Sequence, residues 1–217
     1  MPDFAARRTT MVDTQVRPSD VTKLPIIKAM LTIPRERFAP GALAEAAYIG
    51  ENLDLGEGRV LLDPRTLAKM LDALDIKPNQ LVLDVAPATG YSSAVIAQMA
   101  EAVVAIEPDS GFADDAEAAF EAIGINNIAL ERGAAAEGAQ AHGPYDAIIV
   151  QGGIETFPKA LGDQLKEGGH VCAVFLDGTL GTVRLGVKHA GVIGWRDIFN
   201  AGAPILEGFS AEHSFAL

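Results

Sequence analysis

The sequence predicts an α/β protein built on one doubly wound, mostly parallel sheet. From residue 80 onward, strand-like apolar runs alternate with amphipathic helical runs, which is the pattern of βαβ crossovers. After Phe175 the pattern changes to two runs, 182–188 and 192–199, joined by a turn, and these predict a terminal antiparallel hairpin. Residues 1–63 lack this alternation and are predicted to form an N-terminal extension with short helices.

The extension is expected to be only partly regular. Residues 1–20 are polar and predicted to be irregular, whereas apolar side chains at helical spacing predict a helix over 21–31. Residues 41–63 show little periodicity, and the stretch 54–63 within them contains two glycines, so a loop is expected there. Asp63 followed by Pro64 has the form of an N-cap and first helical residue, and predicts that a helix starts at this point.

The remaining elements follow from the two periodicities of strands and helices. Strands are predicted over 81–86, 102–107, 127–131, 145–151 and 169–176, with helices over 91–100, 111–123 and 155–166. With the terminal hairpin, the sheet is expected to have seven strands. Gly124 is expected to end the second of these helices.

Composition excludes several classes of function. The 217 residues carry a formal net charge of −12 without a Lys/Arg cluster, which argues against a nucleic-acid partner. No apolar run has the roughly 20 residues of a membrane span, and no signal-peptide pattern is present, so a cytoplasmic protein without a membrane partner is expected. The single cysteine, Cys172, excludes an internal disulfide. The four histidines are too scattered to predict a metal site: His142, His170, His189 and His213.

Two acidic residues and the turn between them form a candidate cofactor-binding site. Asp84 ends the first predicted sheet strand, a small-residue turn runs from Ala86 to Gly90, and Glu107 ends the next strand. An acid about twenty residues beyond such a turn can accept hydrogen bonds from both ribose hydroxyls of a cofactor. The glycine pattern that cradles a pyrophosphate is reduced to Gly90, so a cofactor with ribose and no pyrophosphate fits better, which points to S-adenosylmethionine.

Polar residues near this turn have two readings. Gln151 ends the fourth strand and borders the same crevice, where position alone does not separate a ligand contact from a structural role. Ser92 and Ser93 lie in the first turn of the following helix and can either contact a ligand or cap the backbone.

Short motifs along the first 176 residues give the chain a resemblance to a known family. In chain order they are Met11-Val-Asp-Thr-Gln15, Ile33-Pro-Arg-Glu-Arg-Phe38, Leu55-Gly-Glu-Gly58, Val82-Leu-Asp84 through Gly90-Tyr91, Gly143-Pro-Tyr-Asp146 and Gln164-Leu-Lys-Glu-Gly-Gly169. In this order and spacing they are similar to the protein-L-isoaspartate (D-aspartate) O-methyltransferase family.

The resemblance implies a Rossmann-like methyltransferase fold over 64–217, with 1–63 as a helical extension that includes the substrate loop, all as one structural unit. It also implies methyl transfer from S-adenosylmethionine to the α-carboxylate of isoaspartyl residues in damaged proteins. The implied cofactor residues are Asp84, Ala86, Pro87, Ala88, Gly90, Glu107, Gly133, Ala134 and Gln151. The implied substrate-loop residues are Gly58, Val60, Leu61, Leu62 and Asp63.

Three motif positions differ from the family pattern. The G-x-G-x-G turn is Ala86 to Gly90 here, Leu62 stands where the family has an active-site serine, and Ala134 stands where an acid reaches the adenine amino group. No catalytic side chain is therefore assigned. Two alternatives stay open: a catalytically silent homologue kept as a binding module, and a methyltransferase for another acceptor. The sequence does not separate a monomer from a homodimer.

Overall fold

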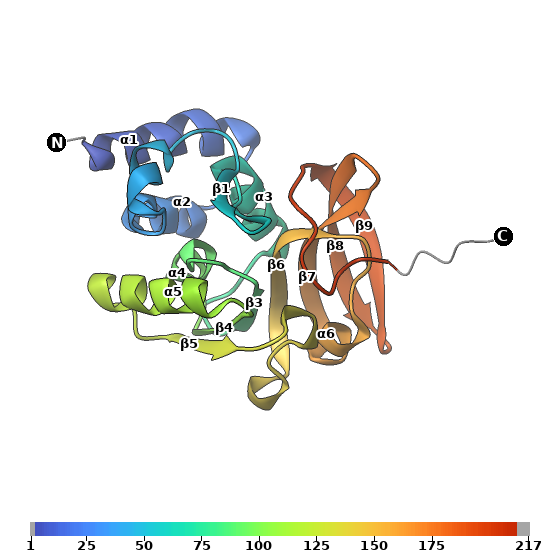
Figure 1. Ribbon diagram of the computed structural model, residues 1–217. Coiled ribbons are helices and arrows are strands. Elements are labelled where there is room, and N and C mark those ends of the chain that lie inside the picture. Colours follow the sequence, from blue (N-terminus) through green and yellow to red (C-terminus); the bar gives the residue numbers. More distant parts are fainter. Residues whose placement is uncertain (1–2, 212–217) are drawn as a thin grey trace.

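The computed structural model describes residues 3–211 and contains a seven-stranded sheet in the order β5-β4-β3-β6-β7-β8-β9 (Figure 1). The sheet strands are β3 (Leu81–Val85), β4 (Ala102–Glu107), β5 (Ile128–Arg132), β6 (Tyr145–Ile154), β7 (Leu165–Asp177), β8 (Leu180–His189) and β9 (Val192–Asn200). The helices are α1 (Phe4–Met11), α2 (Leu24–Thr32), α3 (Pro64–Leu74), α4 (Tyr91–Ala97), α5 (Ser110–Ile123) and α6 (Lys159–Asp163).

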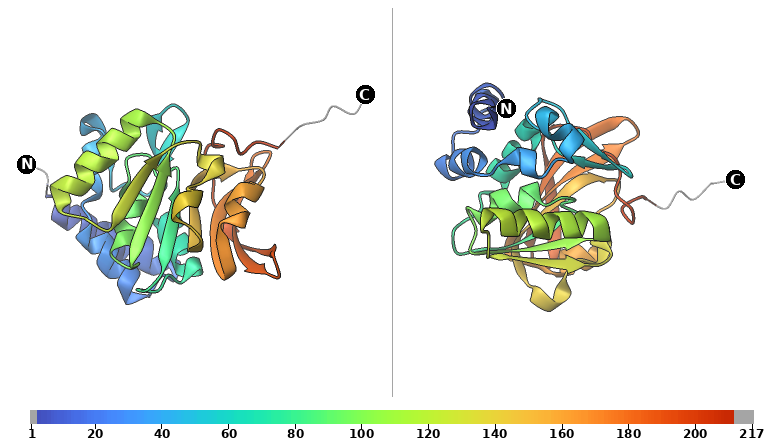
Figure 2. Two further views of the ribbon diagram at one scale, coloured as in Figure 1. Left: turned by 90° about the horizontal axis from the view of Figure 1, so that it is seen from below. Right: turned by 60° about the vertical axis from the view of Figure 1, so that its left-hand side comes forward.

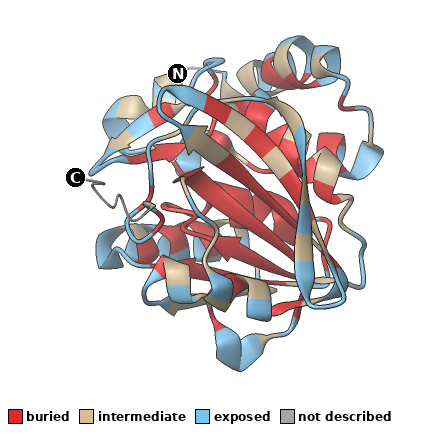
Figure 3. Cartoon of the chain, turned by 90° about the vertical axis from the view of Figure 1, so that its right-hand side faces the viewer, coloured by how far each residue is buried: buried red, intermediate tan, exposed pale blue. Residues whose placement is uncertain are grey.

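The strand directions confirm the predicted fold class. β3 pairs in parallel with β4 on one side and with β6 on the other, β5 and β7 extend the parallel part, and β8 and β9 are antiparallel. Because apolar residues fill successive positions of β3, β4 and β6, both faces of these strands need cover. Figure 3 shows these central strands as buried along almost their whole length.

Each face of the sheet has its own apolar cluster. One face is covered by α3, α4 and α5, with α1 and α2 packed outside them, so the N-terminal helices lie on the same side as α4 and α5 (Figure 1). The other face is covered by α6, by the turns before β6 and by the C-terminal segment, through residues such as Leu161, Leu206 and Phe209. The N-terminal extension and the sheet therefore share one core.

Residues 1–20 are not irregular, so that prediction was wrong over the described part. Asp3 accepts a hydrogen bond from the backbone N–H of Ala6 and so caps α1, and the chain continues as a π-helical turn over Val12–Val16 and a 3₁₀ turn over Arg17–Ser19. Met11, Val12 and Val16 are buried against the main core. Tertiary packing of these three side chains, rather than the propensity of the polar segment, stabilises the helix.

The loop expected over 41–63 is also more regular than predicted. Gly41–Ala46 forms 3₁₀ turns, and β1 (Leu53–Gly56) pairs with β2 (Arg59–Leu61) as an antiparallel hairpin. The hairpin forms because three consecutive tip residues, Gly56, Glu57 and Gly58, adopt positive φ. A hairpin this short has no room for period-two alternation, which is why the pattern was missed.

The predicted caps are confirmed, but two helices are shorter than expected. The Asp63 carboxylate accepts from the Thr66 backbone N–H at 2.9 Å, and Gly124 ends α5 in the left-handed conformation. The helix predicted over 91–100 ends at Ala97 as α4. The helix predicted over 155–166 is reduced to α6, which starts late because Pro158 disfavours helical backbone just before it, and which ends early because β7 begins at Leu165. Within residues 3–211, no helix is both long and apolar enough to cross a membrane.

The segment after β9 folds back over the carboxyl end of β6 (Figure 2). The Gly153 backbone N–H donates to Pro204 O at 2.7 Å, and the Leu206 N–H donates back to Gly153 O at 2.9 Å. A Cβ at Gly152 would lie 2.5 Å from Leu206 Cγ, so Leu206 can pack against β6 only because residue 152 is glycine. This contact places the C-terminal segment beside the sheet edge where the candidate site lies.

Gly90, the N-cap residue of α4, provides a stability test. Its φ is +89°, and an added Cβ would lie 2.5 Å from Cζ of the buried Phe120 ring. We expect Gly90→Ala to lower the free energy of unfolding by about 2–4 kcal/mol, from left-handed strain plus overpacking. Urea denaturation measures the change. Gly124→Ala is the matched control, because Gly124 has φ +71° with no atom within 4 Å of an added Cβ, and equal losses in the two variants would contradict the overpacking.

Candidate functional site

The carboxyl ends of the parallel strands bring most of the predicted site residues to one edge of the sheet. Asp84 near the end of β3, Glu107 at the end of β4 and Gln151 in β6 are buried there, whereas Gly133 and Ala134 follow β5 and are exposed. The Gly133 backbone N–H donates to Glu107 O at 3.3 Å. Ala134 therefore lies at the rim of the site, and the two acids lie inside it.

Asp84 is held by three donors. Its Oδ2 accepts from the hydroxyls of Ser92 and Ser93, each at 2.6 Å, and its Oδ1 accepts from Nε2 of Gln151 at 2.7 Å. Burial raises the pKa of Asp84 to about 6, and these three hydrogen bonds oppose the rise. The carboxylate thus joins the start of α4 and the end of β6 to β3. Gln151 therefore makes a structural hydrogen bond, and Ser92 and Ser93 bind the Asp84 carboxylate in place of the expected backbone cap.

The turn after β3 keeps a glycine-like backbone although two of its residues are alanines. Ala86, Ala88 and Gly90 have φ of 57°, 53° and 89°. Left-handed backbone is costly for a residue with a Cβ, and two anchors hold it here. The Ala86 N–H donates to Ile106 O at 2.9 Å, and the Ala88 N–H donates to Glu107 Oε2 at 2.7 Å. The turn is therefore shaped by β4 and its terminal acid.

Glu107 has a partner that the sequence did not predict. Nη1 and Nη2 of Arg59 donate to Oε1 and Oε2 of Glu107, each at 2.7 Å, and Nη2 also donates to Ala86 O at 2.8 Å. Glu107 is fully buried and Arg59 is 8% exposed. A fork-to-fork pair of this geometry is among the strongest hydrogen-bonded contacts in proteins. It locks the β1–β2 hairpin onto the turn.

The hairpin places the predicted substrate-loop residues in different environments. Gly58 lies at the exposed tip, Val60, Leu61 and Leu62 are buried, and Asp63 caps α3. Arg35, also buried, anchors the end of the hairpin: its Nη2 donates to Leu62 O at 2.9 Å and its Nε to Ala47 O at 2.6 Å. No serine stands at position 62, and the Leu62 side chain contributes apolar volume instead.

Two cavities border the segment that carries the β1–β2 hairpin, and they differ greatly in size. One, of about 340 Å³, has Arg59, Ala86, Pro108, Phe112 and Ala135 in its wall together with Leu206 of the C-terminal segment. The other is only about 10 Å³ and is lined by residues that include Arg35, Leu62, Pro87, Tyr91 and Gln151. The first cavity has room for a ligand group of several rings, whereas the second has room for about one water molecule.

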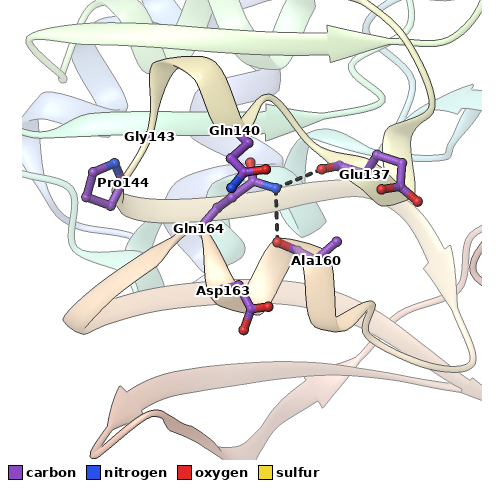
Figure 4. A pocket seen from close by; sticks show the side chains of 7 residues that line it. All are labelled: Glu137, Gln140, Gly143, Pro144, Ala160, Asp163 and Gln164. Carbon is purple, nitrogen blue, oxygen red and sulfur yellow. Dashed lines mark hydrogen bonds between the residues drawn. The ribbon is translucent and has the colours of Figure 1, made fainter.

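A third cavity, of about 390 Å³, lies between α6 and the turns before β6 (Figure 4). Gln164 crosses it, and its Nε2 donates to Glu137 O and Ala160 O while its Oε1 accepts from the Ala139 N–H. The oxygen and the nitrogen of the Gln164 side-chain amide are thus both used in hydrogen bonds that hold the fold. None of the predicted site residues lines this cavity.

Metal ligands do not gather in the part of the chain that the structure describes. Within residues 3–211, no group of three or more His, Cys, Asp or Glu side chains is placed to hold an ion. His142 contacts Glu131, and His170 contacts Leu74 O. His213 lies outside the described residues.

Comparisons with known sequences agree on one family. Residues 6–179 match the family model of protein-L-isoaspartate(D-aspartate) O-methyltransferase. A protein-L-isoaspartate O-methyltransferase of Syntrophus aciditrophicus (strain SB) is 36% identical over 171 residues, which cover 79% of this chain and 78% of that protein. One from Methylorubrum extorquens (strain PA1) is 37% identical over 171 residues, covering 79% and 75%.

Solved structures agree with the fold. A protein-L-isoaspartate O-methyltransferase with 25% identity superposes with a TM-score of 0.81 over 93% of this chain, which spans 66% of that longer chain. A Plasmodium falciparum protein, described as a protein-L-isoaspartate O-methyltransferase in complex with S-adenosyl-L-homocysteine, gives a TM-score of 0.78 at 17% identity. The superposition covers 95% of this chain and 99% of the Plasmodium falciparum chain.

The raised pKa of Asp84 predicts a pH-dependent stability. A carboxyl whose pKa is about 6 when folded and 3.8 when unfolded stabilises the fold below pH 4, and that stabilisation is lost as the pH rises through 6. We expect the unfolding free energy of Asp84→Asn, relative to wild type, to rise by up to about 3 kcal/mol between pH 4 and 7. Urea denaturation across this range measures it. Asp115→Asn, on the exposed face of α5, is the control, and a pH-independent difference for Asp84→Asn would contradict the assignment.

Proposed function

The chain belongs to the protein-L-isoaspartate(D-aspartate) O-methyltransferase family, and on that premise we propose that it transfers a methyl group from S-adenosylmethionine to the α-carboxylate of L-isoaspartyl residues in damaged proteins. The observation that carries the proposal is the family match over residues 6–179, which includes both the hairpin and the acid-bearing strand ends. The match favours this activity over a silent homologue and over another acceptor.

The residues at the strand ends border a cavity that could take an adenosyl group. The cavity of about 340 Å³ is lined by Pro108 and by Ala86, which is the first left-handed residue of the turn. Glu107 would take the ribose hydroxyls, Gly133 and Ala134 would border the base, and the turn from Ala86 to Gly90 would face the methionine part. Both oxygens of Glu107 already have donors, so one set of hydrogen bonds must exchange for the group to bind.

The reaction requires little acid–base catalysis from the protein. The bound cofactor supplies an electrophilic methyl group on a sulfonium. A free carboxylate is ionised near pH 7, so no residue has to accept a proton from it. This agrees with a site that has no serine at position 62. The chain then acts by orientation and by excluding water: Val60, Leu61 and Leu62 form the apolar side, and Arg35 fixes the Leu62 carbonyl.

The same proposal includes the cellular setting. We expect a cytoplasmic enzyme whose partners are isoaspartyl-containing proteins or peptides, without nucleic-acid or membrane partners. The net charge of −12 supports the exclusion of nucleic acid. Cys172 is fully buried and burial raises the pKa of its thiol, which fits a residue with a packing role rather than a reactive one.

A methylation assay tests the proposed activity. With methyl-tritiated S-adenosylmethionine and two peptides that differ only in an isoaspartyl or an aspartyl linkage, we expect base-labile label on the isoaspartyl peptide alone. The aspartyl peptide is the control for non-specific esterification. Absence of label on both peptides at millimolar cofactor would contradict the proposal, and equal labelling would contradict the acceptor.

Restoring an acid at the rim should strengthen cofactor binding. Ala134 is exposed at the end of β5, so Ala134→Asp adds a carboxylate there without filling the core. We expect about tenfold tighter binding of S-adenosylhomocysteine, because a hydrogen bond to a charged group contributes roughly 1.5–3 kcal/mol. Calorimetric titration measures it. Ala118→Asp places the same charge on an exposed position of α5 as the control, and an unchanged affinity for Ala134→Asp would show that the base lies elsewhere.

A further inference from the structure

Glu107 has no free acceptor site for a ligand. Its Oε1 accepts from Arg59 Nη1 at 2.7 Å and from the Asp109 N–H at 3.0 Å, and its Oε2 accepts from Arg59 Nη2 at 2.7 Å and from the Ala88 N–H at 2.7 Å. An ionised carboxylate offers about four lone-pair positions, so all of them are used. Two of the four donors belong to the backbone that shapes the site, and the other two belong to one side chain, Arg59.

Arg59 lies between this carboxylate and open space. It lines the cavity of about 340 Å³, whereas Glu107 is fully buried behind it. Its guanidinium carbon is 5.5 Å from the centroid of the Phe112 ring, which belongs to the same cavity wall. A group that fills this cavity therefore meets the guanidinium before it meets Glu107.

Among the donors to Glu107, Arg59 is the one that lies on a side chain and next to open space. Its Nε is buried and has no hydrogen-bond partner, so the side chain is not fully satisfied where it lies. It is carried at the base of the hairpin tip, where Gly56 and Gly58 adopt positive φ and have no atom within 4 Å of an added Cβ. The Ala88 and Asp109 N–H groups, in contrast, are fixed by the strand ends.

We propose that Arg59 is an intramolecular competitor of the cofactor: its guanidinium occupies the ribose acceptor on Glu107, and the adenosyl group binds when the hairpin withdraws it. The inference rests on the proposed function. Only molecules in which the Arg59–Glu107 pair is open can bind the cofactor. Arg59 then lowers the apparent affinity, because it reduces the fraction of molecules in that state. A pair that is closed in nine molecules of ten lowers the apparent affinity about tenfold.

Titration of three proteins with S-adenosylhomocysteine tests this inference. Arg59→Gln removes the charge and the fork geometry, and we expect it to bind at least about tenfold more tightly than wild type. Arg65→Gln, an exposed arginine on α3, is the matched control and should bind as wild type does. Urea denaturation first establishes that each variant is folded at the titration temperature.

The outcomes separate the two proposals. If wild type and Arg65→Gln bind S-adenosylhomocysteine and Arg59→Gln binds equally or more weakly, the competitor role is overturned and the proposed function stands. If none of the three binds at millimolar ligand, both are overturned.

A second variant and a direct measurement cover the case in which Arg59→Gln does not fold. Arg59→Lys keeps the charge but loses the bidentate fork, and a severalfold gain in affinity is expected. In wild type, the NMR signal of the Arg59 Nε–H group, assigned by its absence in Arg59→Lys, should shift when S-adenosylhomocysteine is added. An unshifted signal at saturating ligand would overturn the displacement.

Discussion

The buried pair between Arg59 and Glu107 joins three separate parts of the chain. It links the β1–β2 hairpin to the end of β4, and through Ala86 O and the Ala88 N–H it links both to the turn after β3. Burying two charges costs free energy that the pair recovers only with good geometry, and loss of one partner from such a pair typically costs about 3–5 kcal/mol. The pair therefore fixes the Arg59 end of the hairpin over the strand ends, while Arg35 anchors the other end at Leu62.

The turn between β3 and α4 explains how glycine positions can hold alanine. Left-handed backbone at Ala86 and Ala88 costs on the order of 1–2 kcal/mol for each residue, yet both keep it, since the β4 backbone and Glu107 hold the N–H groups. Both alanines thus keep a backbone conformation that glycine adopts readily. They change the surface of the turn, where two methyl groups and the Pro87 ring now stand, and Pro87 and Leu62 border the cavity of about 10 Å³.

The sequence predicted those parts whose signal is local. Periodicity located the sheet strands and α5, and cap residues located α3, because burial on a regular element leaves a repeating pattern. Two features of the site have no such signal. The partner of Glu107 is Arg59, 48 positions earlier in the chain, and nothing in a short basic segment identifies its partner. Position in the sequence leaves the roles of Ser92, Ser93 and Gln151 open, and only the three-dimensional contact assigns them to the Asp84 carboxylate.

The two sides of the site are closed by different contacts of one hairpin. On the side of the larger cavity, the barrier is the Arg59 guanidinium. The hairpin tip over 56–58 precedes Arg59, and open space surrounds the positions that a Cβ would take at Gly56 and Gly58. On the other side, the barrier is the apolar run ending at Leu62, whose carbonyl Arg35 clamps at 2.9 Å. Movement of the tip alone would free Glu107 and leave the Arg35 clamp intact. On the proposed function, the side of Glu107 can therefore open without disturbing the apolar side, whose cavity of about 10 Å³ stays bounded by Arg35 and Leu62.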